Sequence, residues 1–200
     1  MMTAEEALEE LKQGNRAYVA DESESSQMGA DSGGRMRAVR AQSPIAAILS
    51  CADSRVIPEL IFNQGLGRLF VVRVAGNIAD DSQVGSIEYA IEQLGVRLLV
   101  VVGHSNCGAV AAALSNATGL SPALSKVVAT VNRVVSSLSE GSEKPTIDQV
   151  IEANVQKAIE DIAEKSPIIE EAAESGELMM LGAVYELETG QVRFLEPSRA

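Results

Sequence analysis

Several residue types are scarce in this 200-residue chain, and each shortage narrows the possible functions. Tryptophan is absent, aromatic residues make up 3% of the chain, and 16 basic residues oppose 28 acidic ones, giving a net charge of −12. An acidic chain with no basic run and few rings to stack on bases is not expected to bind nucleic acid. Its apolar runs are far shorter than the roughly 20 residues that cross a bilayer, so we expect no membrane span.

Cysteine and histidine are scarcer still, with two cysteines and one histidine in the whole chain. The first 20 residues carry four glutamates and lack the basic start and apolar core of a secretory signal. We therefore expect a cytoplasmic protein, in which thiols stay reduced. A disulfide between the two cysteines is a less favoured alternative, and so are two ordinary core cysteines.

The apolar pattern predicts an α/β fold in a single domain, residues 1–200. Strand-like runs cover 44–50, 68–75, 96–103, 178–187 and 191–196, and helical patterns cover 4–20, 56–64, 80–94, 107–117, 121–138, 146–165 and a short stretch from 166. The alternation implies right-handed crossovers, and residues 188–190 form a hairpin turn. We expect a mainly parallel four-stranded sheet with an antiparallel fifth edge strand, flanked by helices. Residues 44–200 are the core, and 1–43 form an N-terminal helix and arm, with a possible short helix near 35–40.

Both cysteines and the histidine lie directly after predicted strands. Cys51 follows the first strand and His104 the third, while Cys107 is three residues beyond His104 at a helix start. Ligands of open parallel sheets gather at the carboxyl ends of the strands, and neighbouring strands are only about 4.8 Å apart. Two thiolates and one imidazole suit Zn²⁺, so these three residues are the predicted metal ligands.

The fourth coordination position decides whether such a zinc is catalytic or structural. Asp53 is the one nearby candidate ligand, and Arg55 competes for its carboxylate. If Arg55 holds Asp53, the zinc keeps a water whose pKa falls toward about 7, giving a hydroxide nucleophile. If Asp53 ligates permanently, the zinc is structural.

With these residues the chain resembles a β-class carbonic anhydrase along most of its length. The shared motifs are Gly14-Asn15-Arg16, Cys51-Ala52-Asp53-Ser54-Arg55, Phe70-Val71-Val72-Arg73, Ala75-Gly76-Asn77, His104 through Gly108, and Gly182-Ala183-Val184-Tyr185. The resemblance implies reversible hydration of carbon dioxide to bicarbonate by zinc-bound hydroxide. It also implies Cys51, His104 and Cys107 as zinc ligands and Asp53–Arg55 as the catalytic pair.

Three further positions resemble the plant-like type I members, whose active site is accessible. These are Gln42, Phe70 and Tyr89. The resemblance implies a dimer or higher homo-oligomer in which Gln42 and Tyr89 come from the partner subunit. Carbon dioxide would lie against Phe70 and Ala75, and Gln42 and the Gly108 amide would hold a substrate oxygen.

The chain also departs from the family pattern. Arg68 stands where an acidic residue is usual, Val74 replaces a common asparagine, and Ala75 is smaller than the usual valine or isoleucine. The first two could alter the support of Arg73 and the subunit interface, and Ala75 could widen the apolar wall.

Three alternative functions stay open on the sequence. The same zinc site could hydrolyse carbon disulfide or carbonyl sulfide, or serve a non-catalytic bicarbonate-sensing module. The cysteines could also form a redox dithiol. Because no second histidine exists, proton release falls to water, Tyr89, a carboxylate or buffer.

Overall fold

The computed structural model describes residues 2–22, 31–39, 41–139 and 144–196, and these residues build one five-stranded sheet. The strands are β1 (Ala46–Ser50), β2 (Leu69–Arg73), β3 (Leu98–His104), β4 (Met179–Tyr185) and β5 (Val192–Phe194). Their order is β2-β1-β3-β4-β5, with β1 to β4 parallel and β5 antiparallel to β4. The predicted sheet is confirmed, including its antiparallel edge.

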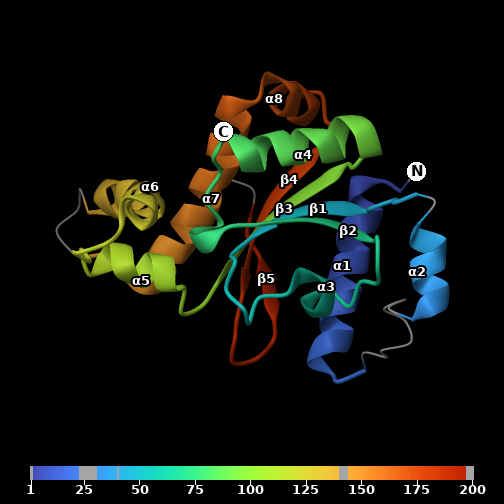
Figure 1. Cartoon of the computed structure of the whole chain (residues 1–200), viewed down its shortest axis with the longest axis horizontal. Helices are drawn as coiled ribbons and strands as arrows, with labels where there is room; N and C mark the ends of the chain where they lie inside the picture. Colours follow the sequence, from blue (N-terminus) through green and yellow to red (C-terminus); the bar gives the residue numbers. More distant parts are fainter. Residues whose placement is uncertain (1, 23–30, 40, 140–143, 197–200) are drawn as a thin grey trace.

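Helices cover both faces of this sheet (Figure 1). They are α1 (Ala4–Val19), α2 (Ser32–Ala38), α3 (Pro58–Ile61), the 3-10 turn η1 (Ala75–Asn77), α4 (Asp81–Leu94), α5 (Gly108–Leu114), α6 (Pro122–Leu138), α7 (Ile147–Lys165) and α8 (Pro167–Glu174). One core cluster joins α1 and α3 to the sheet, and a second joins α4, α7 and α8 to the opposite face. A third cluster packs α5 and α6 against α7 and contains both cysteines. None of the helices in the described part of the chain is long and apolar enough to cross a membrane.

Most element boundaries lie within a few residues of those expected, and the differences have local causes. Strand β3 begins at Leu98 rather than at Val96 because the Val96 amide donates to the carbonyl of Ala90 and closes the end of α4. Gly95 makes this possible with a left-handed φ of 68°. Helix α5 ends at Leu114, and Asn116 follows it with φ of 50°. The predicted helix near 35–40 is found as α2, seven residues long; residue 40 lies outside the described ranges.

The strand order places a switch point between β1 and β3. After β1 the chain forms β2 on one side of it and then crosses to form β3 on the other side. A crevice at such a point, outside the carboxyl ends of the strands, is where ligands bind in open α/β sheets. Cys51 follows β1, and His104 is the last residue of β3, so both lie at this point.

Helix α7 packs unusually close to the sheet at two glycines. A methyl group on Gly103 of β3 would lie 2.6 Å from Val155, and one on Gly182 of β4 would lie 2.8 Å from the same valine. The absence of side chains at these positions therefore sets how near α7 approaches the strand that ends in His104.

Candidate metal centre

Three side chains converge at the switch point. The sulfur atoms of Cys51 and Cys107 and a ring nitrogen of His104 all lie within 4.8 Å of one another, and all three residues are buried. The structure thus brings together the three ligands predicted from the sequence. Zinc bonds of about 2.3 Å to sulfur and 2.0–2.1 Å to nitrogen suit a cluster of this size.

The histidine ring is oriented for metal binding. Its Nδ1 lies 2.9 Å from the Ser105 carbonyl oxygen, which makes Nδ1 the donor and leaves the Nε2 lone pair free. Nε2 is buried and has no hydrogen-bond partner among the described residues. Because buried polar atoms normally have partners, this orphaned nitrogen fits a metal ligand.

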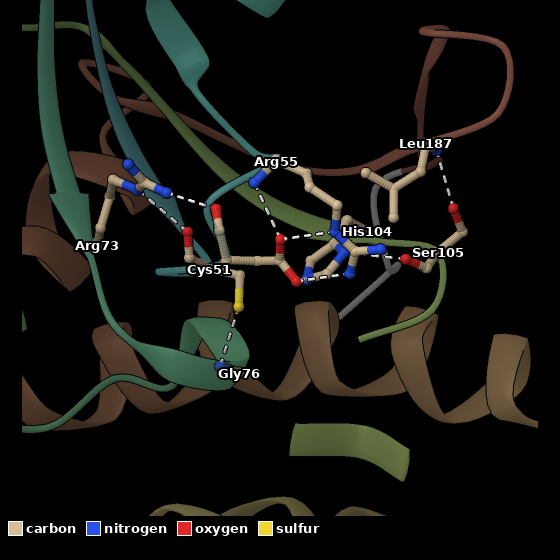
Figure 2. Close-up of polar contacts among 8 residues, drawn as sticks. Cys51, Arg55, Arg73, Gly76, His104, Ser105 and Leu187 are labelled. Carbon is tan, nitrogen blue, oxygen red and sulfur yellow. Dashed lines mark hydrogen bonds and ion pairs between the residues drawn. The ribbon is translucent and has the colours of Figure 1, made fainter. Parts of the chain in front are cut away.

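The turn after His104 is fixed to the end of β4. Ser105 donates its amide to the Tyr185 carbonyl at 3.0 Å and accepts the Leu187 amide on its hydroxyl at 2.9 Å. Figure 2 shows Ser105 directed toward Leu187, away from Cys51. These contacts hold the carbonyl that orients the imidazole.

The two thiols behave as a pair. A hydrogen bond from Cys107 lowers the pKa of Cys51 to about 4, and His104 and the Gly76 amide act in the same direction. The same hydrogen bond and burial raise the pKa of Cys107. The shared hydrogen bond favours one thiolate and one thiol in this pair when no metal is bound, and zinc binding releases the remaining proton.

Asp53 faces the metal cluster while remaining bound to Arg55. Its carboxylate accepts the Arg55 side chain at 2.9 and 2.7 Å and the Arg55 backbone amide at 3.0 Å. Its Oδ2 lies 3.9 Å from His104 Nε2. The Arg55 hydrogen bonds hold the pKa of Asp53 well below its usual range, so the carboxylate is ionised and occupied. Three hydrogen bonds from Arg55 therefore compete with any bond from this carboxylate to a metal.

Arg73 at the end of β2 supports the loop that carries Cys51 and Asp53. Its Nε donates to the Cys51 carbonyl at 3.1 Å, and its Nη2 donates to the Asp53 carbonyl at 2.6 Å. Figure 2 shows Arg73 on one side of this loop and Arg55 on the other. The sequence pattern contains Arg73 but does not reveal this role, because the acceptors are backbone atoms 20 and 22 positions away.

A second supporting contact comes from α7. Asn154 is 3% exposed and donates to the Gly76 carbonyl at 2.8 Å, and the Gly76 amide lies 3.3 Å from the Cys51 sulfur. Asn154 is not among the residues predicted from the sequence. The available signal was a polar residue in the otherwise apolar buried stripe of α7, made of Val150, Ile151, Val155, Ala158 and Ile162.

Two of the three departures from the family pattern, Arg68 and Val74, have clear local environments. Arg68 forms an ion pair with Glu10 of α1, with nitrogen and oxygen 2.5 Å apart. Val74 is half-buried and packs against two of the core clusters. Neither substitution disturbs Arg73, which keeps its two carbonyl acceptors.

Two of the predicted substrate-binding residues are chain neighbours of groups in the metal cluster. Ala75 begins η1 beside Gly76, whose amide donates to the Cys51 sulfur, and Gly108 is the first residue of α5, directly after Cys107. Gly108 is exposed, and nothing lies within 4 Å of the position that a side chain there would take.

Gln42, Phe70 and Tyr89 lie elsewhere. Gln42 is exposed ahead of β1, so the five residues of that strand, about 17 Å, separate it from Cys51. Phe70 pairs with Ala47, four residues before Cys51, which corresponds to about 13 Å along the strand. Tyr89 packs against Phe70 with ring centroids 6.1 Å apart and is 48% exposed. Within one chain these residues do not join the metal cluster.

A buried Cys₂His set with a carboxylate beside it, at the carboxyl edge of a parallel sheet, identifies the class of protein as a zinc-dependent α/β enzyme.

Comparison with known proteins agrees with this class. The family model described as carbonic anhydrase matches residues 46–192. Carbonic anhydrase 2 of Mycobacterium tuberculosis is 38% identical over 183 residues, covering 90% of this chain and 87% of the relative. A carbonic anhydrase of Mycolicibacterium smegmatis is 38% identical over 185 residues, covering 91% and 88%.

Solved structures agree as well. A tetrameric β-carbonic anhydrase of Sordaria macrospora superposes with a TM-score of 0.75 at 25% identity, covering 94% of this chain and 96% of that one. The Coccomyxa β-carbonic anhydrase in complex with acetazolamide gives a TM-score of 0.72 at 28% identity, covering 94% and 86%. The chain belongs to the β-class carbonic anhydrase family, and its reaction is the zinc-dependent hydration of carbon dioxide.

Proposed function

We propose that this chain hydrates carbon dioxide reversibly through an accessible, type I site, in which Arg55 keeps the Asp53 carboxylate away from the metal. The observation that carries the proposal is the set of three hydrogen bonds from Arg55 to Asp53, with Asp53 Oδ2 still 3.9 Å from His104 Nε2. Cys51, His104 and Cys107 would hold the zinc. Zinc bound there supplies Lewis-acid activation of a water at neutral pH.

The protein residues around the metal have distinct roles in this proposal. Asp53 stays ionised, accepts a hydrogen bond from the nucleophile and so aims an oxygen lone pair at the substrate carbon. The Gly108 amide binds an oxygen of carbon dioxide or bicarbonate, and Ala75 forms part of the apolar wall. Tyr89, a carboxylate, water or buffer carries the proton to solvent.

We further propose that the catalytic unit is a homodimer or larger assembly of this single-domain chain. Phe70 lies about 13 Å along the strands from the level of Cys51, and Gln42 lies ahead of β1, at the opposite end of that strand from Cys51. Tyr89 of α4 packs against Phe70, so the two form one aromatic unit away from the metal cluster of their own chain. A second copy would therefore supply all three residues, which extends the expectation made for Gln42 and Tyr89 to Phe70. The tetrameric state of the Sordaria macrospora enzyme is consistent with self-association. A reducing compartment, the cytoplasm, suits two free thiols that serve as ligands.

Zinc content and carbon dioxide hydration, measured together on the wild type and on Asp53→Ala, test the role of the acidic residue. We expect stoichiometric zinc in both proteins and a large loss of turnover in the variant. Wild-type turnover in Asp53→Ala would refute the assigned role, and zinc without turnover in the wild type would favour a sensing module. The relatives described above are named carbonic anhydrases, so carbonyl sulfide and carbon disulfide hydrolysis are not favoured; parallel assays with carbon dioxide and carbonyl sulfide check this.

Subunit complementation tests the dimer. Phe70→Ala keeps the metal ligands, whereas Cys107→Ser keeps the aromatic unit. If Phe70 acts in the partner's site, random mixing of the two inactive variants restores about a quarter of wild-type activity, because half of the dimers contain one intact site. Mixing His104→Ala with Cys107→Ser is the control and restores none. Failure of the first mixture to regain activity, despite proven subunit exchange, would place Phe70 outside the partner's site.

A further inference from the structure

The side chain of Asn154 is a polar group in an apolar environment. It lies on α7 at 3% exposure, between Val150 and Ile151 on one side and Val155 and Ala158 on the other, all of them buried. Burying an amide costs free energy unless its hydrogen bonds are made. Asn154 makes one such bond to another element of the fold, and that element contacts a metal ligand.

This element is the turn η1, and Gly76 is the residue of the turn that Asn154 contacts. Asn154 Nδ2 donates to the Gly76 carbonyl at 2.8 Å, in a buried contact between residues 78 positions apart. Gly76 has φ of 71°, a left-handed conformation that side chains disfavour, and a methyl group there would lie 3.0 Å from the Ala109 side chain. A side chain at this position would therefore be strained, both in its backbone conformation and against Ala109.

The opposite side of Gly76 contacts the metal cluster. Its amide donates to the Cys51 sulfur at 3.3 Å, and Figure 2 shows this bond reaching the thiol from the turn below it. The amide and the carbonyl of Gly76 flank one Cα atom, so fixing the direction of the carbonyl restricts the direction of the amide. Asn154 is in a position to impose that restriction from α7.

The two thiols differ in where the backbone amides near their sulfur atoms come from. The backbone amides near Cys107 come from Ala109 and Val110, at the start of the helix that Cys107 itself caps. Cys51 has a local backbone donor in Asp53, but its other donor, the Gly76 amide, comes from a loop 25 positions away that is held by a third element. Only the Cys51 contact depends on long-range packing.

We propose that Asn154 is a positioning residue for the metal centre: by holding the Gly76 carbonyl, it aims the Gly76 amide at the Cys51 sulfur and limits the charge that this thiolate donates to the metal. Outer hydrogen bonds of this kind tune metal affinity and reactivity. The inference rests on the Cys₂His zinc site described above, and it assigns a function to a residue that touches neither metal nor substrate.

Cobalt substitution gives a direct readout of sulfur-to-metal donation that is separate from activity. We expect the sulfur-to-cobalt charge-transfer band to move to lower energy in Asn154→Leu and in Asn154→Ala, because a thiolate without its amide donor is more electron-rich. Asn154→Ala removes the NH₂ donor without adding bulk, so it also serves if Asn154→Leu folds poorly. In the zinc enzymes kcat should fall about tenfold, with KM for carbon dioxide nearly unchanged.

Val150→Ala is the matched control. Val150 is a fully buried residue of α7 in the same core cluster as both cysteines, and its side chain makes no hydrogen bond. It should lower stability through the cavity it creates and leave the cobalt band in place. A band unmoved in both Asn154 variants would overturn the proposal, as would an equal shift in Val150→Ala. A wild-type protein without any sulfur-to-cobalt band would instead refute the thiolate site itself.

Discussion

Alanine at Gly103 should destabilise the protein at the contact between β3 and α7. The added methyl group would lie 2.6 Å from Val155 Cγ2 and 3.2 Å from Ile151 Cγ2. Carbon atoms normally pack at about 3.5–4.0 Å. The helix would have to withdraw from the strand, or the two side chains leave their preferred rotamers, and overpacking of this kind costs about 1–3 kcal/mol.

Thermal unfolding at fixed protein and zinc concentrations measures this cost, since bound metal and self-association both shift the midpoint. For a chain of this length the expected loss corresponds to a fall in Tm of about 2–12 °C. Gly85→Ala is the control: it lies exposed within α4, nothing occupies the space its methyl group would take, and alanine there should stabilise the helix by about 0.5–1 kcal/mol.

A double-mutant cycle separates this contact from other effects of alanine at Gly103. Val155→Ala removes the atom nearest to the new methyl group, so Gly103→Ala should cost about 1 kcal/mol less in that background. The same cost in both backgrounds, or a Gly103→Ala protein as stable as the wild type, would show that this glycine does not set the approach of α7 to β3.

Four further predictions concern the site. Arg55→Met should retain zinc but lose at least about tenfold in activity. Arg133→Met is the control and should change neither zinc content nor activity, because Arg133 donates only to Thr130 among the contacts described. Full activity in Arg55→Met would contradict the proposal that Arg55 keeps Asp53 away from the metal. Because Arg55 lowers the pKa of Asp53 in the folded chain, the Arg55–Asp53 ion pair stabilises the fold above about pH 4, and this stabilisation is lost as the pH falls below that value. The unfolding midpoint should therefore fall in acid for the wild type, and fall less for Arg55→Met. Removal of zinc with a chelator should lower Tm, by an amount equivalent to about 2.7 kcal/mol when the reference contains free zinc at 100 times its Kd, and added zinc should restore it. Turnover should rise with buffer concentration, since His104 is the single histidine and is buried as a ligand; buffer-independent turnover would show that the protein provides its own proton path.

The sheet and the metal ligands could be predicted from the sequence because their signals are local. The continuous apolar run of β3 indicates a strand buried on both faces, and all seven of its residues are buried. Cys51 and His104 lie directly at strand ends, so the parallel arrangement alone brings them together. The capping box of Thr3 and Glu6 likewise marks the start of α1.

The supporting contacts could not be predicted because they join distant backbone atoms. The Gly76 carbonyl that binds Asn154, and the two carbonyls that bind Arg73, exist at every residue and leave no mark in the sequence. The close approach of α7 depends on the absence of side chains at Gly103 and Gly182, and a glycine in a strand has several possible explanations.

The metal ligands and the aromatic pair of Phe70 and Tyr89 are therefore separated within the chain. The metal ligands come from the carboxyl ends of β1 and β3, and Arg73 and Asn154 of the same chain support them. Phe70 lies toward the amino end of β2, beside Tyr89 and away from this cluster along the strand. On the proposed dimer, zinc affinity is a property of each chain, whereas turnover requires the assembly. Substitutions at the aromatic pair should then spare the metal, and substitutions at Asn154 should alter it in every subunit independently.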